Sequence, residues 1–152
     1  MRIAVIFFSL LIIVFSCKDS KDEVMDPGLI IEAPDDKMEI EEILAGTSSR
    51  AWVSESFNLE IYGSIECRSD DVFTFFNDGT FEYDGGQMLC GDSDNSQIVT
   101  GTWEVDLNNN RIIFDKGLET ETIANYITVK EDVLRVMGSW NSLSIDASYI
   151  RQ

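Results

Sequence analysis

Residues 67–90, which read CRSDDVFTFFNDGTFEYDGGQMLC, decide the fold. Two short runs rich in aromatic and β-branched residues flank Asp78-Gly79, a dipeptide typical of a two-residue type I′ turn. Such a turn joins adjacent antiparallel strands and sets their register. The predicted register places Phe76 opposite Phe81 and Thr74 opposite Tyr83. This segment is therefore expected to be a β-hairpin.

The same register predicts the environment of the hairpin's side chains. Carried outward, it sets Cys67 opposite Cys90, which predicts a disulfide between them, although Gly85-Gly86 indicates a break in the ladder first. Phe73 and Phe75 are expected on the outward face, where they need cover from another element or form an exposed contact surface. The face expected to point inward carries Val72, Thr74, Phe76, Phe81 and Tyr83.

Other strand-length runs surround this hairpin and are separated by short turn signals such as Asn141-Ser142. With the hairpin they predict strands at residues 50–60, 71–77, 80–83, 98–107, 111–115, 121–129, 133–140 and 143–151. A short helix is expected at residues 38–44, ended by Gly46, and no later segment has a helical period. The expected fold is all-β, a domain at residues 39–152 whose eight antiparallel strands close into a small up-and-down barrel. An open sandwich is the alternative.

The N-terminal segment predicts export. Arg2 is followed by an uncharged apolar run at residues 3–15, which is too short to span a bilayer but suits a signal peptide. Ser16-Cys17 then makes residues 1–16 resemble a bacterial lipoprotein signal peptide. This resemblance implies that the Cys17 thiol carries the lipid anchor, with Val14 and Phe15 departing from the usual pattern. The alternative is an ordinary signal peptide that is cleaved elsewhere.

Residues 17–38 are acidic, contain both prolines, Pro27 and Pro34, and are expected to form a flexible tether. The run at residues 18–23, KDSKDE, is similar to the export signal of Bacteroidetes lipoproteins on the outer face of the outer membrane. The resemblance implies an outer-membrane, surface-exposed protein. A generic solvated tether and the periplasmic face are the alternatives.

The chain also resembles the lipocalin-like domain family of Bacteroidetes lipoproteins. The similar elements are LAGTSSRAW at residues 44–52, the hairpin sequence with its later cysteine, and GTWEVD at residues 101–106. The resemblance implies a calyx-like barrel on a lipid tether. The side chains expected to line a cavity are Trp52, Phe76, Phe81, Tyr83, Trp103, Phe114 and Tyr126, with Trp140 as a further candidate. Plain core packing is the alternative for each.

The composition argues against several functions. The chain has 28 acidic and 11 basic residues and a net charge of −17, so binding to nucleic acid is not expected. It has no histidine, and no phosphate-binding loop or nucleophile motif is evident, so neither catalysis nor a cofactor is expected. Asp70-Asp71 could share acid–base chemistry, but solvated charge is the favoured interpretation. Asp92, Asp94 and Asn95 match the calcium-loop pattern only in part, so no metal site is predicted.

Two functions fit these features. One is a ligand-binding barrel for a small apolar or amphipathic molecule, which predicts a connected apolar cavity. The other is a non-catalytic module that docks a protein or glycan partner, which predicts a filled barrel with Phe73 and Phe75 exposed.

Overall fold

The structure is a computed structural model that describes residues 29–90, 98–140 and 143–152. Within these residues it contains one α-helix, two 3-10 helices and nine β-strands. Their bounds are α1 Lys37–Ala45, β1 Ser49–Leu59, β2 Gly63–Ser64, η1 Glu66–Arg68, β3 Val72–Phe76, β4 Thr80–Asp84, β5 Ile98–Asp106, η2 Leu107–Asn109, β6 Arg111–Phe114, β7 Thr122–Val129, β8 Val133–Trp140 and β9 Leu143–Arg151. All eight expected strands are present, and β2 is a short addition to the end of β1.

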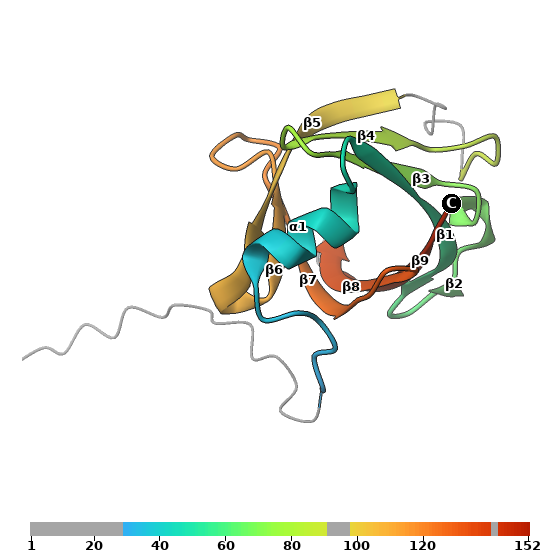
Figure 1. Ribbon diagram of the computed structural model, residues 1–152. Coiled ribbons are helices and arrows are strands. Elements are labelled where there is room, and N and C mark those ends of the chain that lie inside the picture. Colours follow the sequence, from blue (N-terminus) through green and yellow to red (C-terminus); the bar gives the residue numbers. More distant parts are fainter. Residues whose placement is uncertain (1–28, 91–97, 141–142) are drawn as a thin grey trace, which may run out of the picture.

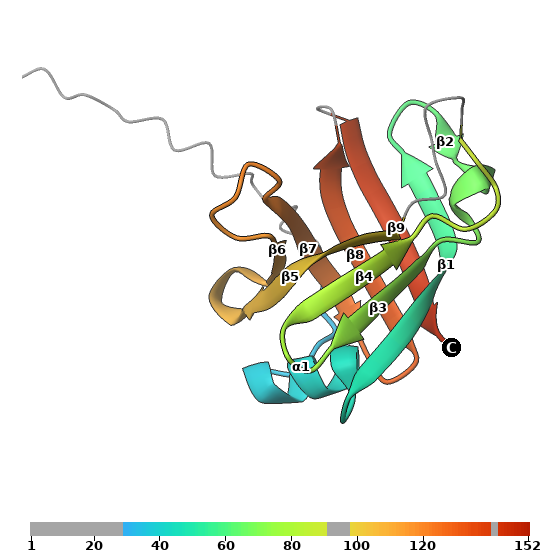
Figure 2. The same ribbon diagram turned by 90° about the horizontal axis from the view of Figure 1, so that it is seen from above.

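The strands form a closed antiparallel barrel. From β3 onward each strand pairs with the next along the chain, and β1 pairs with both β3 and β9 (Figures 1 and 2). The first strand thereby closes the sheet onto the last one, as in the pairing of Trp52 with Arg151. The predicted all-β, up-and-down barrel of eight strands with a short N-terminal helix is confirmed, and the open sandwich is excluded.

A bulge in β1 keeps its apolar side chains inside the barrel. The pairing with β9 shifts between Ser54 and Ser56, so the alternation of inward and outward positions changes there. Trp52 and Ser54 are buried before the bulge, and Leu59 is buried after it, whereas Glu55 at the bulge is exposed. One extra residue thus allows a long strand to bend around the barrel without turning its apolar face outward.

The β3–β4 hairpin has a register one residue away from the predicted one. Phe75 pairs with Phe81, because the loop contains three residues, Asn77, Asp78 and Gly79. Gly79 has a positive φ of 83°, whereas Asp78 does not have the positive φ that a type I′ turn requires. The Oδ1 atom of Asp78 instead accepts a 3.0 Å hydrogen bond from the backbone N–H of Thr80. The predicted two-residue turn is therefore wrong.

This shift exchanges the two faces of β3, because successive side chains point to opposite sides of a strand. Phe75 is 1% exposed, and Phe73 packs against the core, so both phenylalanines that were expected outside lie inside. Phe76 lies on the opposite face from Phe75 and is not part of the core cluster. Phe81 and Tyr83 on β4 point inward as predicted.

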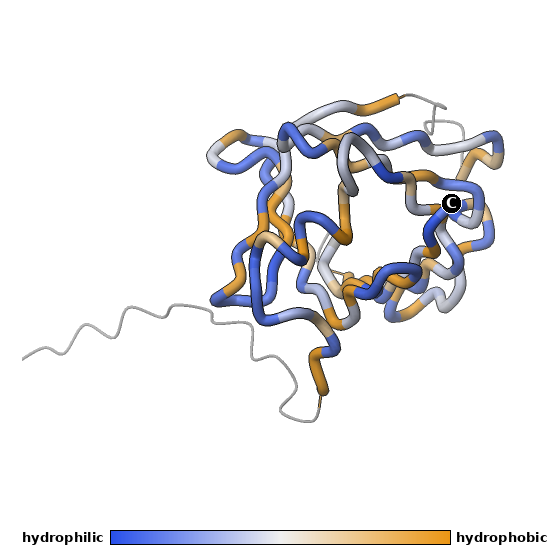
Figure 3. Tube along the Cα trace, viewed as in Figure 1, coloured by the Kyte–Doolittle hydropathy of each residue, from blue (hydrophilic) through white to orange (hydrophobic). Residues whose placement is uncertain are grey.

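Helix α1 closes one end of the barrel, and the β1–β2 hairpin lies at the other end (Figure 2). Asp36 caps the helix by accepting hydrogen bonds from the backbone N–H groups of Met38 and Glu39. Ile40 and Leu44 on its inner side are fully buried against the core, whereas most outer positions are hydrophilic, with the exposed Met38 as an exception (Figure 3). The helix ends at Gly46 as predicted.

The described chain packs on the barrel before α1 begins. The backbone N–H of Glu32 donates a hydrogen bond to the carbonyl of Ile127, and the N–H of Val129 donates one to the carbonyl of Glu32. Ile31 and Ala33 pack against the core cluster on either side of this contact. The folded unit therefore begins several residues before residue 39, within the segment expected to be tether.

Candidate ligand-binding cavity

The interior of the barrel contains a cavity of about 940 Å³ that is open to solvent. All eight barrel strands contribute to its wall, and η1, with Cys67 and Arg68, and Cys90 also line it. The volume lies within the usual range for small-molecule sites, about 300–1,000 Å³. The lining is mainly apolar and includes Phe57, Leu59, Phe73, Phe75, Phe81, Phe114, Val136 and Ile145.

Phe73 is the centre of an aromatic cluster in this wall. Its ring centroid lies 4.8 Å from that of Tyr83, 5.7 Å from that of Tyr149 and 5.8 Å from that of Phe114. The Phe73–Tyr149 pair is edge-to-face, which is a favoured aromatic arrangement. These contacting rings form a continuous apolar surface in the cavity wall.

The cavity wall also carries a polar group of residues beside η1. The Tyr83 hydroxyl donates a 2.5 Å hydrogen bond to Oδ2 of Asp71 and accepts a 3.0 Å hydrogen bond from a guanidinium N–H of Arg68. The Arg68 guanidinium lies 3.6 Å from Oδ2 of Asp71, and the Asp71 side chain is only 4% exposed. Burial, followed by the contact with Asp71, raises the pKa of Tyr83 well above its usual range.

Tyr149 lies close enough to this group to experience its charges. Burial is the main cause that raises the pKa of Tyr149, and the Asp71 carboxylate raises it further, while Arg68 partly opposes them. The residue is 6% exposed and lines the cavity from β9. Its hydroxyl is therefore neutral at ordinary pH and can donate a hydrogen bond.

Three of the seven residues that were predicted to line the cavity do so: Phe81, Tyr83 and Phe114. The other four are absent from its lining: Trp52, Trp103 and Tyr126 are buried in the core cluster, and Phe76 faces away from the interior. The Trp140 side chain lies outside what the structure describes.

Trp52 and Trp103 connect elements at the closed end of the barrel. The Trp52 indole N–H donates a 2.9 Å hydrogen bond to the carbonyl of Leu44, and the Trp103 indole N–H donates a 3.1 Å hydrogen bond to the carbonyl of Phe76. Both side chains therefore belong to the packed core. Core packing was the alternative interpretation for each predicted cavity residue.

The polar group beside η1 was not predicted from the sequence, because neither Asp70 nor Asp71 was expected to be buried. Asp71 is 3% exposed, and Oδ2 of Asp70 accepts hydrogen bonds from the backbone N–H groups of Gln87 and Met88. The interpretation of this pair as solvated charge is therefore wrong. Tyr149 could have been found, because Ile145, Ala147 and Tyr149 alternate along the predicted last strand.

The predicted disulfide between Cys67 and Cys90 is present. The cysteines do not continue the hairpin ladder, because Cys67 lies in η1, outside the β3–β4 pairing. Their Cα atoms are 5.2 Å apart, a typical separation for a disulfide. The bond connects η1, which carries Arg68, to the segment that follows β4.

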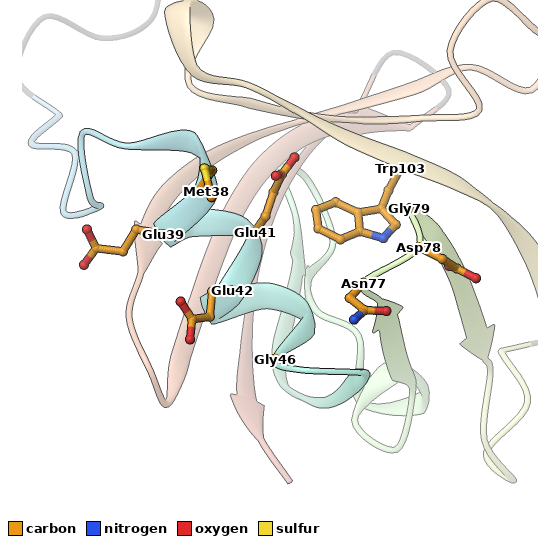
Figure 4. Close-up of a pocket in the computed structure, with 9 residues that line it drawn as sticks. All are labelled: Met38, Glu39, Glu41, Glu42, Gly46, Asn77, Asp78, Gly79 and Trp103. Atoms are coloured by element: carbon orange, nitrogen blue, oxygen red, sulfur yellow. The ribbon is translucent and has the colours of Figure 1, made fainter.

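A second, more polar groove of about 510 Å³ lies outside the barrel, between α1 and the β3–β4 loop (Figure 4). Glu39, Glu41, Glu42 and Asp78 contribute acidic side chains to it, and the Trp103 ring forms part of its wall. No group of three or more histidine, cysteine or acidic side chains in the described parts of the chain is placed to hold a metal ion. Asp92, Asp94 and Asn95 lie outside the described residues.

No protein-family model matches the chain, and no curated protein matches it. The lipocalin-like lipoprotein resemblance therefore stays a prediction. Among the described residues, none of the helices has the length and apolar character needed to cross a membrane.

Proposed function

We propose that the barrel binds a small apolar or amphipathic molecule in its interior. The observation that carries this proposal is the 940 Å³ cavity with its largely apolar wall. A barrel that served only as a scaffold would gain stability by filling this space with side chains. The location of Phe73 and Phe75 adds support, since both line the cavity.

We propose further that Cys17 carries a lipid that anchors the protein to the outer membrane, with the barrel on the cell surface. Its support is the sequence of residues 1–23. The described chain reaches the barrel beside Ile127 and Val129, near the end closed by α1. The chain advances 15 residues from Cys17 to Glu32 and so extends at most about 50 Å between them. Attachment at the closed end would leave the opposite end of the cavity clear of the anchor.

Native mass spectrometry of protein purified from its own membranes tests ligand binding directly. A retained lipid-like mass is the expected result. Binding of the fluorescent probe N-phenyl-1-naphthylamine to delipidated protein gives a second readout, with one saturable site expected.

A cavity-filling variant shows whether the probe enters the barrel. Ala124 lines the cavity, so Ala124→Phe is expected to weaken probe binding at least several-fold. Ala51 does not line the cavity, and Ala51→Phe is the matched control that adds the same ring elsewhere. Equal binding by both variants, with circular dichroism unchanged, would place the probe outside the barrel and contradict the proposal.

A second candidate function is docking of a protein or glycan partner without catalysis. It is favoured by large apolar side chains that are exposed near the β1–β2 hairpin and beside the disulfide. They include Ile61 at 67%, Tyr62 at 66% and Leu89 at 53% exposure. A docking function predicts that Ile61→Ser and Tyr62→Ser abolish binding of the partner, while Ala124→Phe leaves it unchanged. Ligand binding inside the barrel predicts the opposite pattern for the probe.

A further inference from the structure

The polar side chains beside η1 indicate which chemical group the cavity accepts. Arg68, Tyr83 and Tyr149 all line the cavity, and Asp71 contacts the first two of them. The rings of Phe75, Phe81 and Phe114 form an apolar part of the same aromatic cluster. Asp115, Thr120, Thr122 and Ser139 also line the cavity, and both carboxylate oxygens of Asp115 already accept hydrogen bonds from Thr102 and Thr120. A ligand in the cavity would therefore meet a largely apolar wall, with the group beside η1 as one of its polar locations.

The charges at this location are paired with each other. Arg68 and Asp71 lie 3.6 Å apart, and the Tyr83 hydroxyl connects them through its two hydrogen bonds. An anionic head group placed here would meet the buried Asp71 carboxylate, and a cationic one would meet Arg68. Because an added charge of either sign would disturb an existing pair and lose its hydration, an uncharged head group is favoured.

Tyr149 supplies a hydrogen-bonding group beside this pair. Tyr149 is 6% exposed and lines the cavity. Its hydroxyl forms no hydrogen bond with any residue that the structure describes. The hydroxyl oxygen is not one of the fully enclosed polar atoms that lack a partner, so it is accessible from the cavity. A ligand oxygen in the cavity could accept a hydrogen bond from it.

Tyr126 provides an internal comparison. Its hydroxyl is fully buried without a hydrogen-bond partner, and the residue is not part of the cavity wall. The two tyrosines share a chemical group and deep burial, and they differ in access to the cavity.

We propose that the Tyr149 hydroxyl binds the uncharged oxygen of an amphipathic ligand, an alcohol or an ester, whose apolar chain lies along Phe73, Phe75 and Phe114. This assignment rests on the proposed binding function and narrows its ligand class. Fatty acids and alkylamines of equal chain length are the disfavoured ligands.

Competition against N-phenyl-1-naphthylamine on the purified, delipidated protein tests the assignment at neutral pH. The competitors are dodecanol, dodecanoate and dodecylamine, which share a chain and differ in the head group. Dodecanol is expected to bind about tenfold more tightly than either charged compound, a ratio equivalent to about 1.4 kcal/mol. Tighter binding of dodecanoate or dodecylamine overturns the assignment, and this comparison needs no variant.

Two variants then test the role of the hydroxyl. Tyr149→Phe is expected to lower dodecanol affinity about five- to tenfold, the effect of one net hydrogen bond, and to lower the affinity of the probe, which carries no alcohol or ester oxygen, by less. Tyr126→Phe is expected to change neither affinity. Equal dodecanol affinity in the wild type and Tyr149→Phe overturns the assignment while the binding function stands. Failure of the wild type to bind the probe or any competitor overturns the proposed function and this assignment together.

Discussion

The indole nitrogen of Trp52 lies 2.9 Å from the carbonyl oxygen of Leu44, so that the first barrel strand is connected to the last turn of α1. Both residues are fully buried. The carbonyls at the end of a helix have no partner within the helix and need one from elsewhere when they are buried. This hydrogen bond therefore fixes α1 across the closed end of the barrel.

Replacement of Trp52 by phenylalanine is expected to lower the free energy of unfolding by about 2–3 kcal/mol. The variant loses ring volume and leaves the buried Leu44 carbonyl without its donor. Urea unfolding followed by circular dichroism measures the change. Tyr62→Phe is the control, because Tyr62 is 66% exposed and its replacement should change stability little. Equal unfolding midpoints for Trp52→Phe and the wild type would show that α1 does not depend on this contact.

Gly86 is expected to tolerate alanine much less well than Gly63. Both glycines have a positive φ, 67° and 68°, a conformation that costs a non-glycine residue about 1–2 kcal/mol. A Cβ on Gly63 would meet no atom within 4 Å, whereas one on Gly86 would lie 2.4 Å from Cγ of Asp70. That contact would displace the carboxylate that accepts hydrogen bonds from Gln87 and Met88.

The difference between the two alanine variants isolates the steric effect from the backbone effect. Gly86→Ala should be less stable than Gly63→Ala by about 1–3 kcal/mol in urea unfolding, which is the usual cost of overpacking. Similar losses in both variants would mean that the Asp70 side chain moves away at little cost.

The hairpin shows what could and could not be predicted from the sequence. The strand positions follow from alternating apolar residues and turn signals, and all eight strands were found. The register depends on a single turn, where Asp78-Gly79 fits both a two-residue and a three-residue loop. Asn77 decides between them, because its backbone N–H donates to the carbonyl of Ser48 and its side chain donates to that of Thr47. These partners are distant in sequence, so local propensity could not identify the loop.

The candidate site was predicted less completely than the fold, for a related reason. Trp52, Trp103 and Tyr126 are large and inward-facing, but the position of α1 determines that they form the closed end. Asp71 appeared solvated because its partner Tyr83 lies on the next strand. Burial of a polar group depends on contacts between strands, which a pattern along one strand does not specify.

Reduction of the Cys67–Cys90 disulfide is expected to destabilise the barrel by roughly 3 kcal/mol, because the bond closes a loop with a sequence separation of 23 residues. For a domain of this size the melting temperature should fall by about 10 °C. Thermal unfolding with and without dithiothreitol measures the effect. The double variant Cys67→Ala and Cys90→Ala is the control, since the reductant should not change its melting temperature. An unchanged melting temperature in the reduced wild type would contradict the expected contribution.

Tyr149 should make the stability of the protein fall at alkaline pH. Its pKa in the folded state is raised above the ordinary value of 10.0, first by burial and then by Asp71. Below that value the hydroxyl is protonated in both the folded and unfolded states, so its contribution is fully present. As the pH rises above 10, the unfolded chain releases the proton while the folded chain retains it, and the free energy of unfolding decreases.

Tyr149→Phe removes this titration, so its stability should decline less steeply than that of the wild type above roughly pH 10. Urea unfolding at a series of pH values from about 9 to 11 gives the two slopes. Tyr62→Phe is the matched control, because it removes the hydroxyl of a tyrosine that is 66% exposed and not part of the cavity wall. If Tyr149→Phe and the wild type lose stability in parallel over this interval, the hydroxyl ionises as readily in the folded protein as in the unfolded chain. It would then not be a buried neutral donor in the wall of the cavity.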